Sequence, residues 1–552
     1  MTRNEQAAPW WSSAVVYQIY PRSWSDGDGD GIGDLTGIIT RLPYLRELGV
    51  DAVWLSPFYT SPQADAGYDV ANYYDVDPLF GSLADADTLL SAAHGLGLKL
   101  IVDLVPNHTS DEHVWFQQAL AAAPGSRERD RYIFREGLGP DGATAPNNWL
   151  SVFGGSAWER VTEADGSLNP TSQWYLHLFD VKQPDLNWNN REVHEEFERV
   201  LQFWLDRGVD GFRVDVAHGL VKEAGLPDGT GTSHVADGSQ PMWDQPGVHD
   251  IYREWRDVLD AHAEHSGTEP MMCAEAWVVP AERLAKYVRP DEFHQAFNFA
   301  FLETDWSATH LRCVIDETSS ANAAVGAATT WVLSNHDVVR HATRMGLPPE
   351  AVKLNGVGAD DPQPDAELGL RRARAATAMM LALPGGAYLY QGEELGLPEH
   401  TTMPDEDRQD PTYARSDHAI RGRDGCRVPM PWARDEPADG FNTTGELWLP
   451  QPDAYASLAV DQQVGVDGST LELYRTLLRL RREHALGAAS LSWVDAGCGL
   501  LCFDSGPVRS ITNFGDSAHE LPNAWQVVAG SGPLQDGRLP TDTTVWLTRD
   551  EG

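Results

Sequence analysis

The sequence predicts an α/β fold, a (β/α)8 barrel with a long insertion after its third strand and a β domain at the C-terminus. Three observations predict it. Short β-branched and apolar runs alternate with amphipathic segments, one interval between such runs is much longer than a simple connection, and the last part of the chain contains only short strand-like segments. Together they indicate a large enzyme-sized protein rather than a small disulfide-stabilised module.

Eight short runs have the length and composition of buried parallel strands. They cover residues 15–20, 52–56, 98–105, 211–217, 271–277, 295–299, 330–335 and 387–391. Apolar residues at three- and four-residue spacing predict helices between them, over 34–48, 84–95, 192–206, 247–262 and 368–381. A closed barrel is favoured over a doubly wound sheet, because the turn after the first run, YPRS, lacks the glycines of a phosphate-binding turn.

The interval between the third and fourth runs is too long for a plain loop and includes the Gly-, Pro- and Asn-rich segment 124–169. After a last predicted helix at 470–484, short segments such as GLLCFDSG and TTVWLTR alternate with turn residues, which predicts an antiparallel β-sandwich. The predicted division is a barrel over 1–108 and 183–484, an insertion over 109–182 and the C-terminal domain over 485–552.

Composition excludes several classes of partner. The chain has 552 residues, with 41 Lys+Arg against 82 Asp+Glu and a formal charge of −41, so nucleic acid and anionic membranes are not expected. No window of membrane-spanning length is apolar, the N-terminus lacks a secretory pattern, and the 5 cysteines are scattered and odd in number. We therefore expect reduced thiols, a cytoplasmic location and a monomer or homodimer.

Three acids end predicted strands: Asp215 the fourth, Glu275 the fifth and Asp337 the seventh. Strand ends of a barrel share one mouth, and three buried acids there would be costly without a cation or a reaction to serve. Two carboxylates in one cleft repel, which raises one pKa and leaves the other ionised. A protonated acid and an ionised carboxylate together can cleave a glycosidic bond. The distance between the two carboxyl groups decides whether the anomeric configuration is retained or inverted.

Four segments resemble the ordered sequence regions of glycoside hydrolase family 13, the α-amylase superfamily. They are DLVPNH (103–108), GFRVDVAHG (211–219), AEAW (274–277) and SNHD (334–337). The insertion resembles the B domain of that family, and the likeness extends over nearly the whole chain. The resemblance implies that Asp215 is the nucleophile, Glu275 the general acid/base, and Asp337 an acid that binds sugar hydroxyls and favours the distorted ring.

The same resemblance assigns three supporting side chains. Arg213 is expected beside Asp215, where it would keep that carboxylate ionised. His108 and His336 are expected to hydrogen-bond to sugar hydroxyls and to the developing charge.

The segment QPDLN (183–187) is similar to that of the oligo-1,6-glucosidase and α-glucosidase group, whose members act on chain ends. The resemblance implies that Asp65 and Arg423 close the pocket and grip a terminal glucose. Further substrate-binding residues implied by it are Tyr68 as a stacking platform and Phe153, Phe179 and Gln183 as pocket walls. The predicted function is a retaining exo-α-glucosidase that acts on short oligosaccharides, without an organic cofactor.

Two cues on linkage disagree. Val216, after the nucleophile, resembles α-1,6-acting members, whereas GLVK (219–222) and GRDGCR (422–427) look like maltase-type enzymes. The expected substrates are maltose and malto-oligosaccharides, and α-1,6-linked and sucrose-like substrates are the alternatives. Glucosyl transfer and sucrose isomerisation use the same acids and stay open. A non-catalytic, transporter-associated relative is disfavoured because all three acids are present.

The loop DGDGDGIGD (26–34) has the start of a calcium-binding pattern. Its candidate ligands are Asp26, Asp28, Asp30, the carbonyl of Ile32, and Asp34. Gly37 stands where a helix-loop-helix calcium site has its bidentate acid, so the loop is not of that type. The resemblance to group members with Ca²⁺ in this loop favours a structural ion, Ca²⁺ or alternatively Mg²⁺, away from catalysis.

Overall fold

The computed structural model describes residues 8–162, 172–230 and 234–549. Its central feature is an 8-stranded parallel sheet in the order β11-β10-β9-β5-β2-β1-β13-β12, which is the neighbour order of a (β/α)8 barrel. The strands are β1 (Val15–Ile19), β2 (Ala52–Leu55), β5 (Lys99–Leu104), β9 (Gly211–Val214), β10 (Met271–Ala274), β11 (Gln295–Ala296), β12 (Thr330–Val332) and β13 (Gly386–Tyr390). All eight predicted strands are present, and the predicted barrel is confirmed.

The strands are mostly apolar because both of their faces are buried, and a few polar side chains such as Arg213 on β9 are buried with them. Several predicted runs extend past the carboxyl end of the observed strand: the run 211–217 ends as a strand at Val214, and the run 271–277 ends at Ala274. In the run 211–217 the chain cannot continue as a strand, because Val216 has φ 45°. These ends are where polar residues gather.

Helices flank the barrel strands, and each predicted amphipathic segment is a helix. The long ones are α1 (Leu35–Leu48), α2 (Leu83–Gly95), α4 (Arg191–Arg207), α5 (Val248–Ser266), α8 (Ala308–Val325), α10 (Ala366–Ala382) and α14 (Thr470–Glu483). Shorter ones are α6 (Ala281–Leu284), α7 (Phe299–Glu303), α9 (His341–Arg344), α11 (Pro411–Arg415), α12 (Ala454–Leu458) and α13 (Val460–Gln463). Ser82 caps α2 in a capping box with Asp85, and Gly208 ends α4 in a left-handed conformation.

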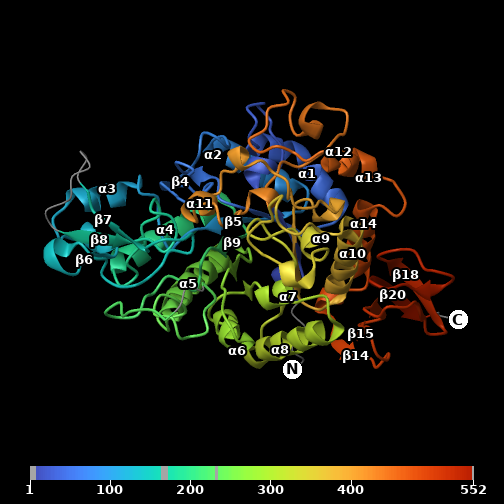
Figure 1. Cartoon of the computed structure of the whole chain (residues 1–552). Helices are drawn as coiled ribbons and strands as arrows, with labels where there is room; N and C mark the ends of the chain where they lie inside the picture. Colours follow the sequence, from blue (N-terminus) through green and yellow to red (C-terminus); the bar gives the residue numbers. More distant parts are fainter. Residues whose placement is uncertain (1–7, 163–171, 231–233, 550–552) are drawn as a thin grey trace.

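The interval between β5 and β9 contains a small separate sheet that lies at one side of the barrel (Figure 1). It consists of β6 (Phe134–Glu136), β7 (Trp158–Arg160) and β8 (Gln173–Leu176) in the antiparallel order β6-β8-β7, with α3 (Val114–Ala121) beside it. A two-stranded sheet, β3 (Tyr59–Thr60) and β4 (Asn72–Val76), follows β2. The insertion boundaries at 109 and 182 remain predictions.

The C-terminal strands form an antiparallel sheet in the order β14-β15-β16-β20-β18. These are β14 (Leu491–Trp493), β15 (Leu500–Ser505), β16 (Val508–Asn513), β18 (Trp525–Gly530) and β20 (Thr543–Arg549), with β17 (His519–Glu520) and β19 (Arg538–Leu539) as a separate ribbon. Trp546 Nε1, on β20, donates to the carbonyl of Ala378 at 2.8 Å, so one face of this sheet lies against α10. Leu539 of the ribbon packs with Ile511 on an apolar cluster of the same sheet. The boundary at 485 remains a prediction.

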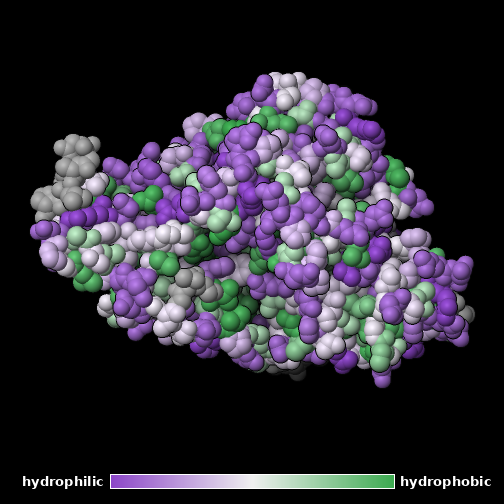
Figure 2. All heavy atoms as spheres, viewed as in Figure 1, coloured by the Kyte–Doolittle hydropathy of each residue, from purple (hydrophilic) through white to green (hydrophobic). Residues whose placement is uncertain are grey.

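Polar side chains cover most of the face seen in Figure 2, and apolar ones gather around a hollow near its middle. Within the residues that the structure describes, no helix has the length and apolar composition to cross a membrane. Each of the five cysteines is free.

Candidate active site

The carboxyl ends of three barrel strands deliver the three predicted catalytic acids to one pocket. Asp215 follows β9, Glu275 follows β10 and Asp337 lies in the loop after β12, and all three line a cavity of approximately 1100 Å³ including its open mouth. Residues far apart along the chain therefore meet because parallel strands of a barrel end on the same side. A pocket of this size suits a small molecule.

Arg213, on β9, lies beneath the first two acids and is fully buried. Its Nη1 donates to Asp215 Oδ1 at 2.7 Å and to Asp103 Oδ1 at 2.9 Å, and its Nη2 lies 3.0 Å from Glu275 Oε2. One guanidinium thus fixes three carboxylates from three neighbouring strands.

One arginine does not offset three buried carboxylates. Burial raises the pKa of Asp103 to about 7, although Arg213 opposes the rise. Burial also raises the pKa of Asp215, and Glu275 and Asp103 add to this, so Arg213 lowers that pKa without keeping it in its ordinary range. Arg213 thus lies beside Asp215 and lowers its pKa, and that it keeps this carboxylate ionised stays a prediction.

Asp337 has the opposite environment. Its Oδ1 accepts from Arg427 Nη2 at 2.9 Å and Arg423 Nη1 at 3.1 Å, and His336 Nε2 lies 3.2 Å from Oδ2. Burial alone would raise the pKa of Asp337, but His336 and the two arginines outweigh it and hold the pKa below its ordinary value. Asp337 is therefore a permanent carboxylate with which sugar hydroxyls can hydrogen-bond.

The Asp65 and Arg423 side chains lie at the same pocket and form an ion pair of 2.7 Å. Arg423 also binds Asp410 through Nε at 2.6 Å, so it joins three acids including Asp337. Gln183 does not line the cavity but supports it, because its Nε2 donates to Asp65 Oδ2 at 3.1 Å. Burial raises the pKa of Asp65 despite Arg423.

Aromatic and imidazole rings form the remaining walls. Tyr68 stacks on His336 with ring centroids 5.3 Å apart and donates to Asp103 Oδ2 at 3.0 Å. Phe153 and Phe179 lie 5.7 Å apart, edge to face, and both line the pocket. His108 also lines it, and burial lowers the pKa of His108 to about 4, so its ring is neutral at pH 7.

Val216 is a strained residue directly after the predicted nucleophile. Its φ of 45° is unfavourable for a β-branched side chain, and its N–H donates to Glu275 Oε2 at 3.0 Å. The strained backbone thus orients the predicted acid and presents the Val216 side chain to the cavity.

All predicted catalytic and substrate-binding residues lie at this pocket or directly behind it: Gln183, Arg213 and His336 form the supporting layer. Two charged residues that the sequence did not indicate complete the ion pairs: Arg427 binds Asp337, and Asp410 binds Arg423. Further lining residues that it did not indicate include His218, His234, Trp243, Trp277, Val338, Leu354 and Asn355. A signal existed for some of them, because His218, Trp277 and Arg427 lie inside the motifs quoted above. Asp410 and Leu354 carry no such signal.

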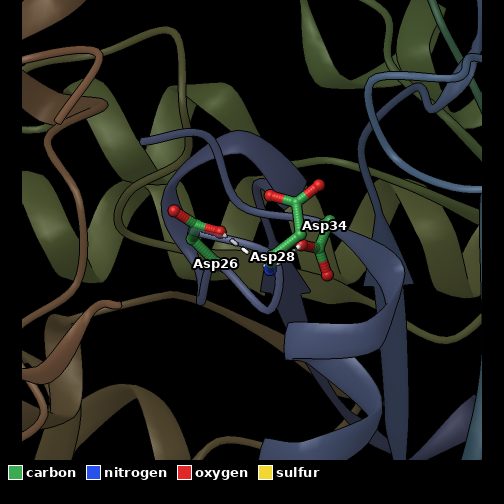
Figure 3. Close-up of side chains that lie close together, drawn as sticks. All are labelled: Asp26, Asp28 and Asp34. Carbon is green, nitrogen blue, oxygen red and sulfur yellow. Dashed lines mark hydrogen bonds between the residues drawn. The ribbon is translucent and has the colours of Figure 1, made fainter. Parts of the chain in front are cut away.

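The predicted metal loop lies before α1, whose N-cap is Asp34. Oxygens of Asp26, Asp28 and Asp34 lie within 4.8 Å of one another (Figure 3). Asp30 is not part of this cluster, and its Oδ1 accepts from the Ile32 N–H at 2.8 Å. The structure thus brings together three of the four predicted carboxylate ligands.

The loop carboxylates have no lysine or arginine partner among the residues described. Asp26 accepts from Gly31 N at 2.8 Å and from Asn442 Nδ2 at 2.8 Å, and Asp34 accepts from Gly27 N at 2.8 Å. Burial raises the pKa of Asp34, so its charge is not compensated by these hydrogen bonds. A cluster of hard oxygen donors with excess negative charge fits Ca²⁺ or Mg²⁺.

Comparison with known proteins agrees with this geometry. The model of the alpha-amylase catalytic domain matches residues 18–489. A probable alpha-glucosidase of Rhizobium meliloti (strain 1021) is 38% identical over 531 residues, which cover 91% of this chain and 89% of the relative. An oligo-1,6-glucosidase of Parageobacillus thermoglucosidasius is 36% identical over 508 residues, covering 86% and 84%. The crystal structure of the alpha-glucosyl transfer enzyme XgtA matches with a TM-score of 0.82 and 36% identity, over 98% of this chain and 100% of that chain.

Proposed function

The chain belongs to the alpha-amylase family, and on that premise we propose that it is a retaining, exo-acting α-glucosidase. It releases α-glucose from the non-reducing end of short α-glucosides. The observation that carries the proposal is the link between the pair Asp65–Arg423 and Asp337 in one pocket. Grouped around one cavity, they can grip the hydroxyls of a single terminal glucose beside the acids that cleave its bond.

In the proposed first step, Asp215 attacks the anomeric carbon while Glu275 gives its proton to the leaving-group oxygen. The bond between these two atoms breaks, and a glycosyl ester on Asp215 forms. In the second step Glu275 takes a proton from water, the water oxygen bonds to the anomeric carbon, and Asp215 leaves as a carboxylate. Asp215 and Glu275 share the guanidinium of Arg213, which supports the shorter carboxylate separation typical of retention.

The experiment is incubation with maltose, isomaltose, sucrose, trehalose and starch, followed by NMR of the released sugar. We expect maltose to be cleaved fastest, α-1,6-linked and sucrose-like substrates more slowly, and starch slowest. A pocket that binds one terminal glucose accepts only chain ends, and starch has few of them. α-Glucose should be the first product. β-Glucose would overturn the covalent mechanism, and starch cleaved as fast as maltose would overturn the exo assignment.

Transfer to an alcohol is the second candidate function, and a similar solved structure is described as an alpha-glucosyl transfer enzyme. Apolar side chains of Val216, Trp243 and Leu354 line the pocket and would favour a bound acceptor over water. Product analysis at high maltose concentration separates the two. Oligosaccharides longer than the donor indicate transfer, and glucose alone indicates hydrolysis.

We further propose that Asp26, Asp28 and Asp34 hold a structural Ca²⁺, with Mg²⁺ as the alternative ion, and that catalysis needs no organic cofactor. The ion would add stability only, since the loop contributes no residue to the pocket lining. A cytoplasmic location and a monomeric or homodimeric state are also proposals. Five free cysteines support a reducing compartment.

A further inference from the structure

Asp69 lies in the loop between β3 and β4, which also carries Asp65, and its side chain is fully buried. Its Oδ2 accepts from the Ala64 N–H at 2.8 Å, and its Oδ1 accepts from the Asp65 N–H at 2.9 Å. Arg22 attracts this carboxylate electrostatically, but among the described residues no lysine or arginine forms an ion pair with it. A buried carboxylate held mainly by backbone N–H groups is costly, which points to a function for these two bonds.

The loop that Asp69 holds has an unusual backbone. Gln63, Ala66 and Gly67 have φ angles of 66°, 50° and 104°, all in the left-handed region. A Cβ atom on Gly67 would lie 2.9 Å from the carbonyl oxygen of Pro57, so the loop packs closely on its neighbour. Such conformations persist only where surrounding groups determine them, and the Asp69 carboxylate is one such group.

Two side chains of this loop, Asp65 and Tyr68, line the pocket. The Asp65 carboxylate pairs with Arg423 at 2.7 Å and accepts from Gln183 Nε2 at 3.1 Å. Its backbone N–H is bound by Asp69. Asp65 is therefore fixed through its side chain and through its backbone at the same time.

The same arrangement occurs at a second acid that binds Arg423. Asp424 is buried, and its Oδ2 accepts from the N–H groups of two successive residues, at 2.9 Å and, for Asp410, at 3.0 Å. Asp410 in turn accepts from Arg423 Nε at 2.6 Å. Two of the acids that bind Arg423 are thus each held at the backbone by a further buried carboxylate.

The charge state of Asp69 agrees with this arrangement. Burial raises the pKa of Asp69 to about 6, although the N–H groups of Asp65 and Ala64 oppose the rise. The side chain is therefore ionised at pH 7, and each of its two oxygens can accept one N–H group.

We propose that Asp69 is a positioning residue for the terminal sugar. It fixes the backbone of Asp65 and so holds the Asp65 carboxylate beside Arg423 before any sugar binds. This inference rests on the proposed α-glucosidase function and on the contact of Asp65 with a sugar hydroxyl.

A double-mutant cycle tests the proposal. An asparagine at position 69 has one accepting oxygen, and its NH2 group faces the second N–H, so Asp69→Asn loses one of the two bonds. We expect KM for maltose and the inhibition constant of glucose to rise about tenfold, with kcat changed less than about twofold. When Asp65→Asn is already present, Asp69→Asn should change both constants less than about twofold, because it acts through Asp65.

Asp77→Asn is the matched control. Asp77 is also buried and accepts from the N–H groups of Ser61 and Leu79 at 2.8 and 2.9 Å, two residues outside the pocket lining. This variant should leave KM and the inhibition constant within about twofold. Unchanged constants in Asp69→Asn, or equal rises with and without Asp65→Asn, would overturn the proposal.

Hydrogen exchange on the unaltered enzyme needs no folded variant. If Asp69 holds the loop, the backbone amides of the peptide covering 61–69 should be protected without sugar, and bound glucose should slow their exchange less than about twofold. Fast exchange that becomes slow only with glucose refutes the inference, since the sugar would then order the loop, and leaves the proposed function intact. An enzyme that cleaves no α-glucoside refutes the proposed function instead.

Discussion

Two groups of carboxylates in this molecule have their charge offset in different ways. At the pocket, Arg213 binds three acids and Arg423 binds Asp65, Asp337 and Asp410. In the loop before α1 the acids accept backbone N–H groups, and no ion pair with a lysine or arginine reaches them among the described residues.

The two groups therefore differ in the source of the positive charge that faces them. Arginines built into the barrel keep the pocket acids at short, defined distances without any added cation. Among the described residues the loop has no such cation, and in the proposal above a bound metal ion would offset its charge. Activity should therefore be sensitive to the pocket arginines and acids, and stability to the ion in the loop.

The largest expected effect follows from Asp215→Asn. The variant has no nucleophile, so kcat should fall by about 10³-fold or more. The melting temperature should not fall, because burial raises the pKa of Asp215 and a neutral amide avoids the cost of burying a charge. Turnover and thermal denaturation are measured on the same preparation.

Asp250→Asn, on the exposed surface of α5, is the matched control and should keep full activity. An Asp215→Asn variant that retains turnover would show that the nucleophile is misassigned.

The next effect concerns the shared cation. Arg423→Met leaves Asp65, Asp337 and Asp410 without it, and should lower the free energy of unfolding by about 3–5 kcal/mol. Urea denaturation measures this loss. Arg423→Lys should recover part of the stability but not the activity, since a lysine cannot reproduce the three-way geometry.

Arg479→Met, which breaks an exposed pair with Glu483 on α14, should cost less than about 1 kcal/mol. If Arg423→Met and Arg479→Met lower the free energy of unfolding equally, the ion pairs of Arg423 do not stabilise the pocket as proposed.

The smallest effect is expected at the loop. Removal of divalent ions with a chelator should lower the melting temperature by a few degrees, and Ca²⁺ at about 100 times its Kd should restore about 2.7 kcal/mol. The pKa of Asp34 is raised by burial, so protons compete with the ion and the Ca²⁺-induced shift should be larger at pH 7.5 than at pH 5.

Asp28→Asn should abolish this response, while kcat at 25 °C stays the same with and without chelator. A chelator that leaves the melting temperature unchanged at both pH values argues against the structural ion.

Much of the fold was predictable because it depends on local periodicity. The eight runs, the amphipathic segments and the turn-rich C-terminal strands correspond to the observed elements, and acids such as Asp215 and Glu275 stand where strands end. The end of the fourth predicted strand was placed too late, since Val216 has a backbone conformation that residue type does not reveal. The site residues came from motifs, and Asp410 and Leu354 lie outside every motif.

The alternation of strands and helices, the excess of acids and the residues at the strand ends could be read from the amino-acid sequence. The folded barrel was needed to show that Arg423 reaches Asp65 across 358 residues and that Asp215 is buried beside two other carboxylates. The reason is physical. Periodic burial is written into neighbouring residues, whereas charge and pKa depend on which distant groups the closed barrel brings within a few ångströms.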